Sequence, residues 1–168
     1  LGGGGAKGYA HLGVLQALEE YGKKPSLVVG TSMGALMGFL YCTGTPLSTL
    51  IAEVEKITRL AFFRLAGFSP WSGMWLFPLS GLEKRLRSAT GDPALEDLPI
   101  PLCTIAVEAH TGKRYIFRRG NAVDAVLASI AVPGYFRPLK RNGIYWVDGG
   151  LVEPLPVESA RELGSEFI

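Results

Sequence analysis

The stretch SLVVGTSMGALMG, residues 26–38, indicates the fold class. Its first half is a short apolar run rich in β-branched residues, which is typical of a buried parallel strand. Its second half carries the small residues Gly34, Ala35 and Gly38, which let a helix pack close to a sheet. Because a helical pattern also precedes the stretch, the order is helix, strand, helix, and we predict an α/β domain.

Hydrophobic spacing predicts the other elements. Residues 9–21 have the pattern of an amphipathic helix, with Leu12, Leu15 and Leu18 at three-residue steps and Gly22 as a suitable stop. Further helices are predicted at residues 47–64, 80–88, 121–131 and 157–163, and further strands at residues 102–109, 114–117 and 143–150.

Local signals mark where some of these elements begin or turn. Ser80 and Glu83 match a capping box, and Asn121 is a suitable N-cap for the helix that follows it. His110 lies between two predicted strands, where we expect a hairpin turn. Residues 66–81 carry many aromatic side chains among prolines, glycines and serines, and we expect either a core plug or a lid that contacts lipid.

The composition limits the classes of function. The chain has 168 residues, enough for one domain with its own core, and 48% of them are hydrophobic. A net charge of +2 is too small to indicate a nucleic-acid partner. Basic residues gather in one third of the chain, and we expect either solvated positions or a surface that meets anionic lipid: Lys113, Arg114, Arg118, Arg119, Arg137, Lys140 and Arg141.

Cysteines and hydropathy indicate little about targeting. Cys42 and Cys103 each lie in an apolar run, which favours buried free thiols over a disulfide or a metal site. No stretch has the roughly 18 apolar residues of a membrane span, and no signal peptide is visible. We expect a cytoplasmic or peripheral membrane location. From its length we expect a single domain, residues 1–168. The abrupt ends favour a domain that is part of a longer chain.

A run of four glycines, residues 2–5, opens the chain and needs a reason, since glycine is costly in ordered backbone. In a phosphate-binding P-loop, G-x-x-x-x-G-K-[ST], a lysine directly follows the second glycine. Here Lys7 follows Ala6, which argues against a P-loop. Gly3, Gly5 and Gly8 match a dinucleotide fingerprint, but that fold needs an acid about twenty residues further on, where this chain is basic.

The third interpretation of the run is an oxyanion hole. Without side chains, the backbone N–H groups of Gly3, Gly4 and Gly5 can point together at one oxygen. A helix that begins behind them adds a favourable potential for negative charge. This use requires a nucleophile nearby in the fold.

Residues 30–34, GTSMG, supply a candidate nucleophile in the pattern G-x-S-x-G. In this pattern a serine lies on a strained turn between a strand and a helix, and glycines such as Gly30 and Gly34 let the chains pass closely. The predicted strand before it and helix after it fit that setting. We therefore predict that Ser32 is catalytic rather than part of a plain tight turn.

A serine nucleophile needs a base to take its proton. A hydrolase triad would place an acid and then a histidine after the serine. The chain has only His11 and His110, and neither follows Asp148. His11 lies on the helix beside the glycines, where we expect a structural role. The sequence therefore gives poor support for a Ser-Asp-His triad.

Three motifs in order, GGGGAKG, GTSMG and VDGG, resemble the signature blocks of the patatin-like phospholipases. Lys7 and Gly8 complete the first block, and the last block is Asp148-Gly149-Gly150. The segment ASIAVPGYFRP, residues 128–138, is also similar to the block that precedes the aspartate in that family.

The resemblance implies a three-layer α/β/α fold with a mainly parallel central sheet. It implies a serine hydrolase that uses no metal or cofactor, with Ser32 as nucleophile and Asp148 as general base. The amides around the glycines at positions 3–5 would form the oxyanion hole, and Lys7 would fix that loop or favour an anionic headgroup. The substrates would be esters of phospholipids or lysophospholipids. The alternative is an inactive scaffold of the same fold that binds lipid or a partner.

Two departures from the family pattern stand out. Nothing precedes Leu1, where relatives have a strand, and Glu153-Pro154 stands where many relatives have an asparagine. The dyad also makes a physical demand, because an ordinary aspartate is a weak base for a serine hydroxyl. Burial against apolar neighbours such as Tyr145, Trp146 and Val147 would raise the pKa of Asp148. Without the other motifs, Asp148 would be interpreted as a turn residue.

Overall fold

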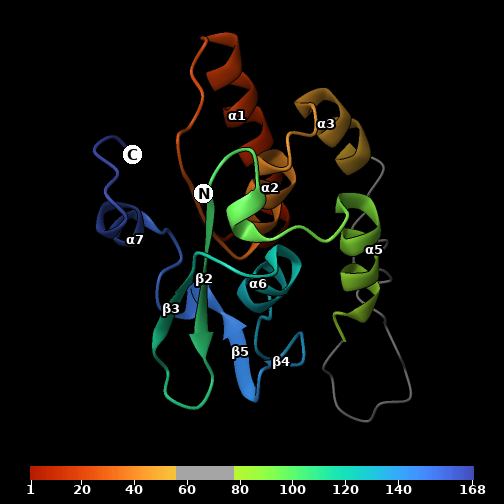
Figure 1. The fold of residues 1–168 in the computed structure, drawn as a ribbon, viewed down its shortest axis with the longest axis vertical. Coiled ribbons are helices and arrows are strands. Elements are labelled where there is room, and N and C mark those ends of the chain that lie inside the picture. The colour runs from red at the N-terminus through yellow and green to blue at the C-terminus, as the bar shows by residue number, and fades with distance from the viewer. Residues whose placement is uncertain (56–77) are drawn as a thin grey trace.

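The computed structural model describes residues 1–55 and 78–168. One or more helices follow each single strand or pair of strands along the described residues (Figure 1). The helices are η1 Gly5–Tyr9, α1 Ala10–Glu20, α2 Met33–Cys42, α3 Leu47–Glu55, α5 Ser80–Thr90, η2 Leu95–Asp97, α6 Ala122–Ser129, η3 Gly149–Leu151 and α7 Val157–Glu162. The strands are β1 Val28–Thr31, β2 Leu102–Glu108, β3 Arg114–Phe117, β4 Leu139–Arg141 and β5 Ile144–Asp148. The second half of the predicted helix at 47–64 and most of the aromatic segment 66–81 lie outside the described residues.

The strands form one five-stranded sheet in the order β1-β2-β5-β4, with β3 also paired to β2. β1 and β2 run parallel, with Val28 opposite Leu102. The other three pairings are antiparallel, so the sheet of the described residues is mixed rather than mainly parallel. Short turns reverse the chain between β2 and β3 and between β4 and β5, and such turns join only antiparallel strands. The α/β class itself is confirmed.

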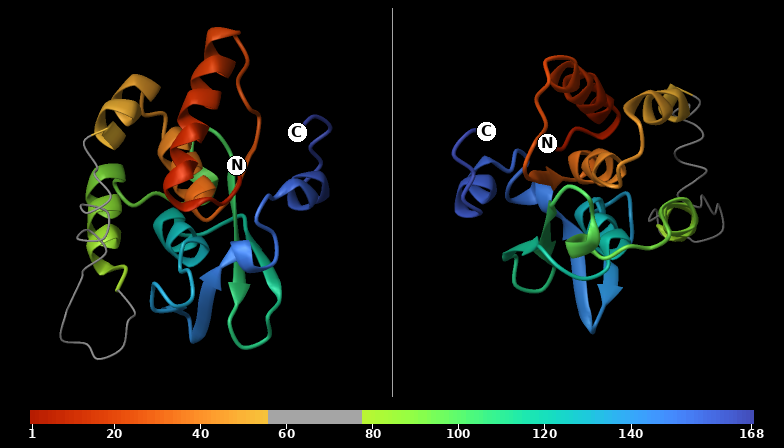
Figure 2. Two further views of the ribbon diagram at one scale, coloured as in Figure 1. Left: turned by 180° about the vertical axis from the view of Figure 1, so that it is seen from behind. Right: turned by 45° about the horizontal axis from the view of Figure 1, so that its top comes forward.

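Helices cover both faces of the sheet (Figures 1 and 2). α2 and α6 pack on one face, where Leu102 and Ala106 of β2 join the main core. Cys103 and Ile105 point to the opposite face and pack with Ala160 of α7. This alternation follows from the period of two along a strand. The predicted three-layer arrangement is present, and none of the helices in the described ranges is long and apolar enough to cross a membrane.

The first residue places the glycine run beside β1. The Leu1 amino group donates to the Val29 carbonyl at 2.7 Å, and the Thr31 N–H donates to the Leu1 carbonyl at 3.0 Å. These are the two contacts of a parallel bridge opposite Gly30. The glycines that follow therefore begin where β1 ends.

Helix starts agree only in part with the local signals. Asn121 caps α6 as predicted, and its side-chain oxygen accepts the Asp124 N–H at 2.8 Å. The capping box at Ser80 is wrong, because α5 has no side-chain cap and the Glu83 carboxylate binds Arg141 instead. An ion pair therefore takes the carboxylate that a capping box would use. The three-residue strand β4 was not predicted.

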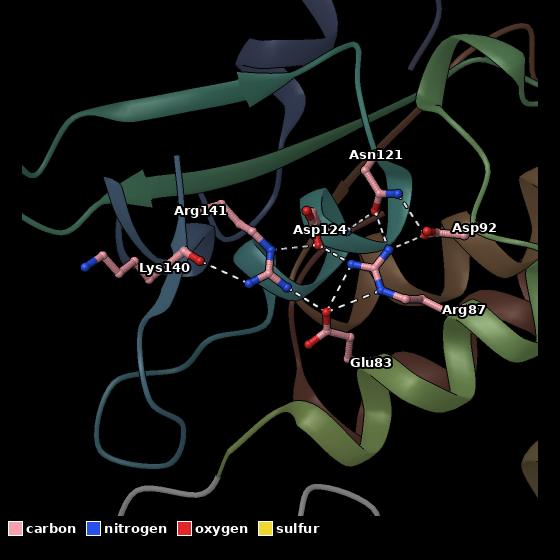
Figure 3. A network of polar contacts seen from close by, with 7 residues as sticks. All are labelled: Glu83, Arg87, Asp92, Asn121, Asp124, Lys140 and Arg141. Atoms are coloured by element: carbon pink, nitrogen blue, oxygen red, sulfur yellow. Dashed lines mark hydrogen bonds and ion pairs between the residues drawn. The ribbon is translucent and has the colours of Figure 1, made fainter. Parts of the chain in front are cut away.

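A network of ion pairs joins α5, α6 and β4 (Figure 3). Arg87 of α5 contacts Glu83 at 3.0 Å and Asp124 at 2.6 Å, and it also pairs with Asp92. Arg141 of β4 contacts Glu83 at 2.7 Å and Asp124 at 2.9 Å. The network therefore fixes the first turn of α6, whose last residue lies at the candidate site.

Candidate active site

Ser32 lies on a sharp turn between β1 and α2. Its backbone has a φ of 55° and a ψ of −123°, a combination that residues other than glycine avoid. A Cβ atom on Gly30 would lie 2.5 Å from the Cα of Ala35, and one on Gly34 would lie 2.2 Å from the Leu1 carbonyl oxygen. Only glycine therefore fits at these two positions beside the serine.

Asp148, the last residue of β5, points its carboxylate at this serine and is only 4% exposed. The Ser32 hydroxyl donates to Asp148 Oδ2 at 2.6 Å, and Asp148 Oδ1 accepts the Gly150 N–H at 2.6 Å. Gly149 passes so close to the sheet that a Cβ atom there would lie 2.3 Å from the Ile105 carbonyl oxygen. The fold thus brings together two side chains that lie 116 positions apart.

Burial raises the pKa of the Asp148 carboxyl above its usual value of 3.8. The hydrogen bonds from Ser32 and Gly150 act in the opposite direction but do not cancel the effect of burial. Trp146 and Val147 are buried beside it, as predicted, whereas Tyr145 is exposed. A raised pKa makes the carboxylate a stronger acceptor for a hydroxyl proton.

The glycine run passes directly beside the serine, since a Cβ atom on Gly3 would lie 3.4 Å from Ser32 Cβ. The Gly3 N–H donates to the Pro154 carbonyl at 2.8 Å, so this amide is engaged within the protein and the expectation for Gly3 needs correction. Gly4 and Gly5 are exposed, and their N–H groups have no acceptor among residues 1–55 and 78–168. Two of the three predicted oxyanion amides therefore remain available.

Neighbouring residues hold this run in place. A Cβ atom on Gly8 would lie 2.1 Å from the Met33 Cγ, so the turn after the run packs tightly against the start of α2. His11 Nε2 hydrogen-bonds the Gly2 carbonyl oxygen at 2.8 Å. The Lys7 side chain is exposed and has no partner in the part of the chain that the structure describes.

Neither histidine hydrogen-bonds the serine or the aspartate. His110 is exposed in the turn between β2 and β3, as predicted, and the ring of His11 is hydrogen-bonded to backbone. Within the described residues, Asp148 is the one acid or base that hydrogen-bonds the Ser32 hydroxyl.

Two residues at the site were missed by sequence reasoning. Ser129 is fully buried at the end of α6, and its hydroxyl oxygen accepts the Ser32 N–H at 2.9 Å. Glu153 uses its carbonyl oxygen to accept the Thr31 hydroxyl at 2.9 Å. Two signals in the sequence pointed at these residues, since Ser129 lies in the block at 128–138 and Glu153 departs from the family pattern. Neither signal reveals the contact partner, which is 97 positions away for Ser129 and 122 positions away for Glu153.

Two residues of the basic cluster form ion pairs on the protein surface. Arg114 contacts Glu153 at 2.9 Å, and Arg141 contacts Glu83 at 2.7 Å. Both side chains stay partly exposed and the other five residues of the cluster are exposed, which fits the expected solvated positions; contact with anionic lipid stays a prediction.

The sequence matches the family described as patatin-like phospholipase over residues 1–161. It is 37% identical over 157 residues to an uncharacterized NTE family protein of Mycobacterium tuberculosis, covering 94% of this chain and 43% of that protein. It is 34% identical over 176 residues to neuropathy target esterase sws of Drosophila melanogaster, covering 100% of this chain and 12% of that protein. The fold is similar to VipD from Legionella pneumophila, with a TM-score of 0.62, 18% identity, and coverage of 89% of this chain and 45% of that chain. The chain thus spans less than half the length of each of these proteins.

Proposed function

The chain belongs to the patatin-like phospholipase family, and from this premise we propose that it is a serine lipid acyl hydrolase. Ser32 is the nucleophile and Asp148 is the general base. The substrates are carboxylic esters of phospholipids or lysophospholipids. The observation that carries the proposal is the 2.6 Å hydrogen bond from the Ser32 hydroxyl to the buried Asp148 carboxylate.

In the first half of the proposed cycle, Ser32 Oγ attacks the ester carbonyl carbon while its proton moves to Asp148 Oδ2. The carbonyl oxygen becomes an oxyanion, which the N–H groups of Gly4 and Gly5 bind. A single donor of this kind is worth roughly 3–4 kcal/mol. The ester C–O bond then breaks, the leaving alcohol takes the proton from Asp148, and the acyl group stays on Ser32.

In the second half, a water molecule attacks the acyl carbon and gives its proton to Asp148. The tetrahedral intermediate collapses, the fatty acid leaves, and the proton returns to Ser32 Oγ. The same two side chains therefore serve both halves of the reaction.

Contact with a membrane surface belongs to the same proposal. Leu151 and Val152 directly follow residues 148–150, which we call the base loop, and they are 60% and 46% exposed. The Lys7 side chain, next to the glycine run in the sequence, is also exposed. Exposed apolar side chains and an exposed cation suit a lipid surface that carries negative charge. Replacing Leu151 and Val152 with Gln should reduce co-sedimentation with anionic vesicles several-fold. Tyr21→Gln, a change at the far end of α1, should leave it unchanged; equal loss in both variants would contradict the placement.

A fluorophosphonate ester tests the proposed nucleophile directly, because it forms a stable covalent adduct with an activated serine. We expect mass spectrometry to map the adduct to Ser32 in the folded protein and to find none after denaturation. Ser32→Ala should abolish labelling, and Ser88→Ala, a change at an exposed serine on α5, should remain labelled at Ser32.

Two outcomes would count against the proposal. A folded protein whose Ser32 stays unlabelled, while a known serine hydrolase reacts, would favour the inactive lipid- or partner-binding scaffold. An adduct on a different serine would move the active site elsewhere.

A further inference from the structure

Glu153 lies where three segments meet: the base loop, the glycine run, and β1, which leads to Ser32 and is called the nucleophile strand below. Its N–H donates to the Gly149 carbonyl at 2.9 Å, and its own carbonyl accepts the Thr31 hydroxyl at 2.9 Å. The next carbonyl, that of Pro154, accepts the Gly3 N–H at 2.8 Å. Two consecutive residues therefore contact the residue after the base, the residue before the nucleophile, and the glycine run.

The Glu153 carboxylate anchors this junction. Its side chain is only 8% exposed. Oε1 accepts the Ser159 N–H at 2.9 Å, while Oε2 accepts the Ser159 hydroxyl at 2.5 Å and Arg114 Nη1 at 2.9 Å. Arg114 also reaches Glu162 at 2.5 Å. The carboxylate is thus tied to both α7 and β3, and a buried carboxylate that loses such partners is strongly destabilising.

We propose that Glu153, held by Arg114 and Ser159, is a positioning residue that fixes the glycine run and the nucleophile strand relative to Asp148. It does not touch the substrate; it acts through the backbone carbonyls at 153 and 154. This inference rests on the proposed hydrolase function. Its physical basis is that an error of about 1 Å in the placement of catalytic groups can cost about a hundredfold in rate.

The first test is Glu153→Ala, assayed on a p-nitrophenyl acyl ester well below its melting temperature. We expect kcat to fall about tenfold or more while KM stays within about twofold, because the reacting groups shift and the acyl-binding surface does not. Labelling of Ser32 by the fluorophosphonate should slow in parallel. Glu153→Gln should retain more activity, since an amide oxygen still accepts the Ser159 N–H. Glu158→Gln, an exposed neighbour on α7, is the matched control and should match the wild type.

The second test is Thr31→Val, which removes the hydroxyl contact to residue 153 without touching the carboxylate. It should also lower kcat with little change in KM. Combined with Glu153→Ala it should cost less than the two single effects multiplied, because both changes loosen one junction. If Glu153→Ala does not fold, Thr31→Val alone decides.

The outcomes separate this inference from the function on which it rests. If the wild type hydrolyses the ester with Ser32 while both folded variants keep kcat within about twofold, the positioning role is wrong and the hydrolase function stands. A rise in KM with kcat unchanged would also overturn it. If the wild type does not hydrolyse the ester and its Ser32 is not labelled by the fluorophosphonate, the proposed function fails and the inference fails with it.

Discussion

Ser32 has a backbone conformation, and Asp148 a buried carboxylate, that each cost free energy. A non-glycine residue with a φ of 55° costs roughly 1–2 kcal/mol, and a carboxylate that is 4% exposed loses most of its hydration. The turn holds the hydroxyl of the serine against the carboxylate, and burial makes that carboxylate more basic. At the residue scale, both costs therefore serve the proposed proton transfer.

The pH dependence of the wild type follows from the raised pKa of Asp148. The base must be deprotonated, so kcat/KM should fall as the pH drops through that raised pKa, which lies above 3.8. The measurement is a pH–rate profile between about pH 4 and pH 8. An acid limb that lies at or below the ordinary aspartate value would contradict the proposed role.

The raised pKa of Asp148 also makes the stability of the fold depend on pH, in the direction opposite to that of kcat/KM. Because the folded state favours the protonated form of Asp148, its contribution to stability is lost as the pH rises from 3.8 through the raised pKa. Asp148→Asn removes the buried charge, so at pH 7 this inactive variant should melt at or above the wild-type temperature. A clear fall in melting temperature at pH 7 would mean that the charged form is stabilising.

Gly4→Ala tests the glycine run. A Cβ atom there would lie 3.6 Å from Lys7 Cβ, an ordinary contact, but the φ of 159° is one that residues with a side chain rarely adopt, so the run should shift locally while the rest of the fold persists. The added methyl group lies beside the amides proposed to bind the oxyanion, and kcat should fall about tenfold or more with KM nearly unchanged. Gly22→Ala is the matched control, because Gly22 also has a positive φ, of 68°, and a Cβ atom there would meet nothing within 4 Å. Equal kinetics in the two variants would argue against the oxyanion assignment.

At the scale of elements, the sequence predicts best what is decided within a few residues. The strand at β1, the turn at Ser32 and the N-cap at Asn121 each depend on local spacing, and each is present. The capping box at Ser80 fails because Glu83 finds Arg87 and Arg141 instead, and Arg141 lies in a strand of only three residues. A local pattern does not reveal such a competing partner.

Arg87→Met tests the network that ties α5 to α6. Removing the guanidinium takes away the ion pair of Asp92 and leaves Glu83 and Asp124 with Arg141 as their shared cation, so the free energy of unfolding should fall by about 1–3 kcal/mol. Arg85→Met, an exposed change on the same helix, should have little effect. The measurement is urea unfolding of both variants. Equal midpoints would mean that the network adds nothing to stability.

At the scale of the whole molecule, the resemblance of three ordered motifs to the family's blocks implies a pair of Ser32 and Asp148, and the structure places the two side chains in hydrogen-bond contact. The sequence did not reveal that the Gly3 amide is occupied by the Pro154 carbonyl, because that contact depends on how distant segments meet. The same reason hid Ser129 and the antiparallel pairings of the sheet. Motifs indicate the groups that we propose to react, whereas the fold decides which residues hold those groups in place.

The most direct test of the central claim is kcat/KM for ester hydrolysis by Asp148→Asn, measured beside Asp97→Asn, an exposed aspartate on η2. We predict a loss of about a thousandfold or more in Asp148→Asn, with the fold retained, because the amide cannot accept the serine proton. Asp97→Asn should match the wild type. Activity of Asp148→Asn within about tenfold of the wild type would contradict the account and assign the base to another group.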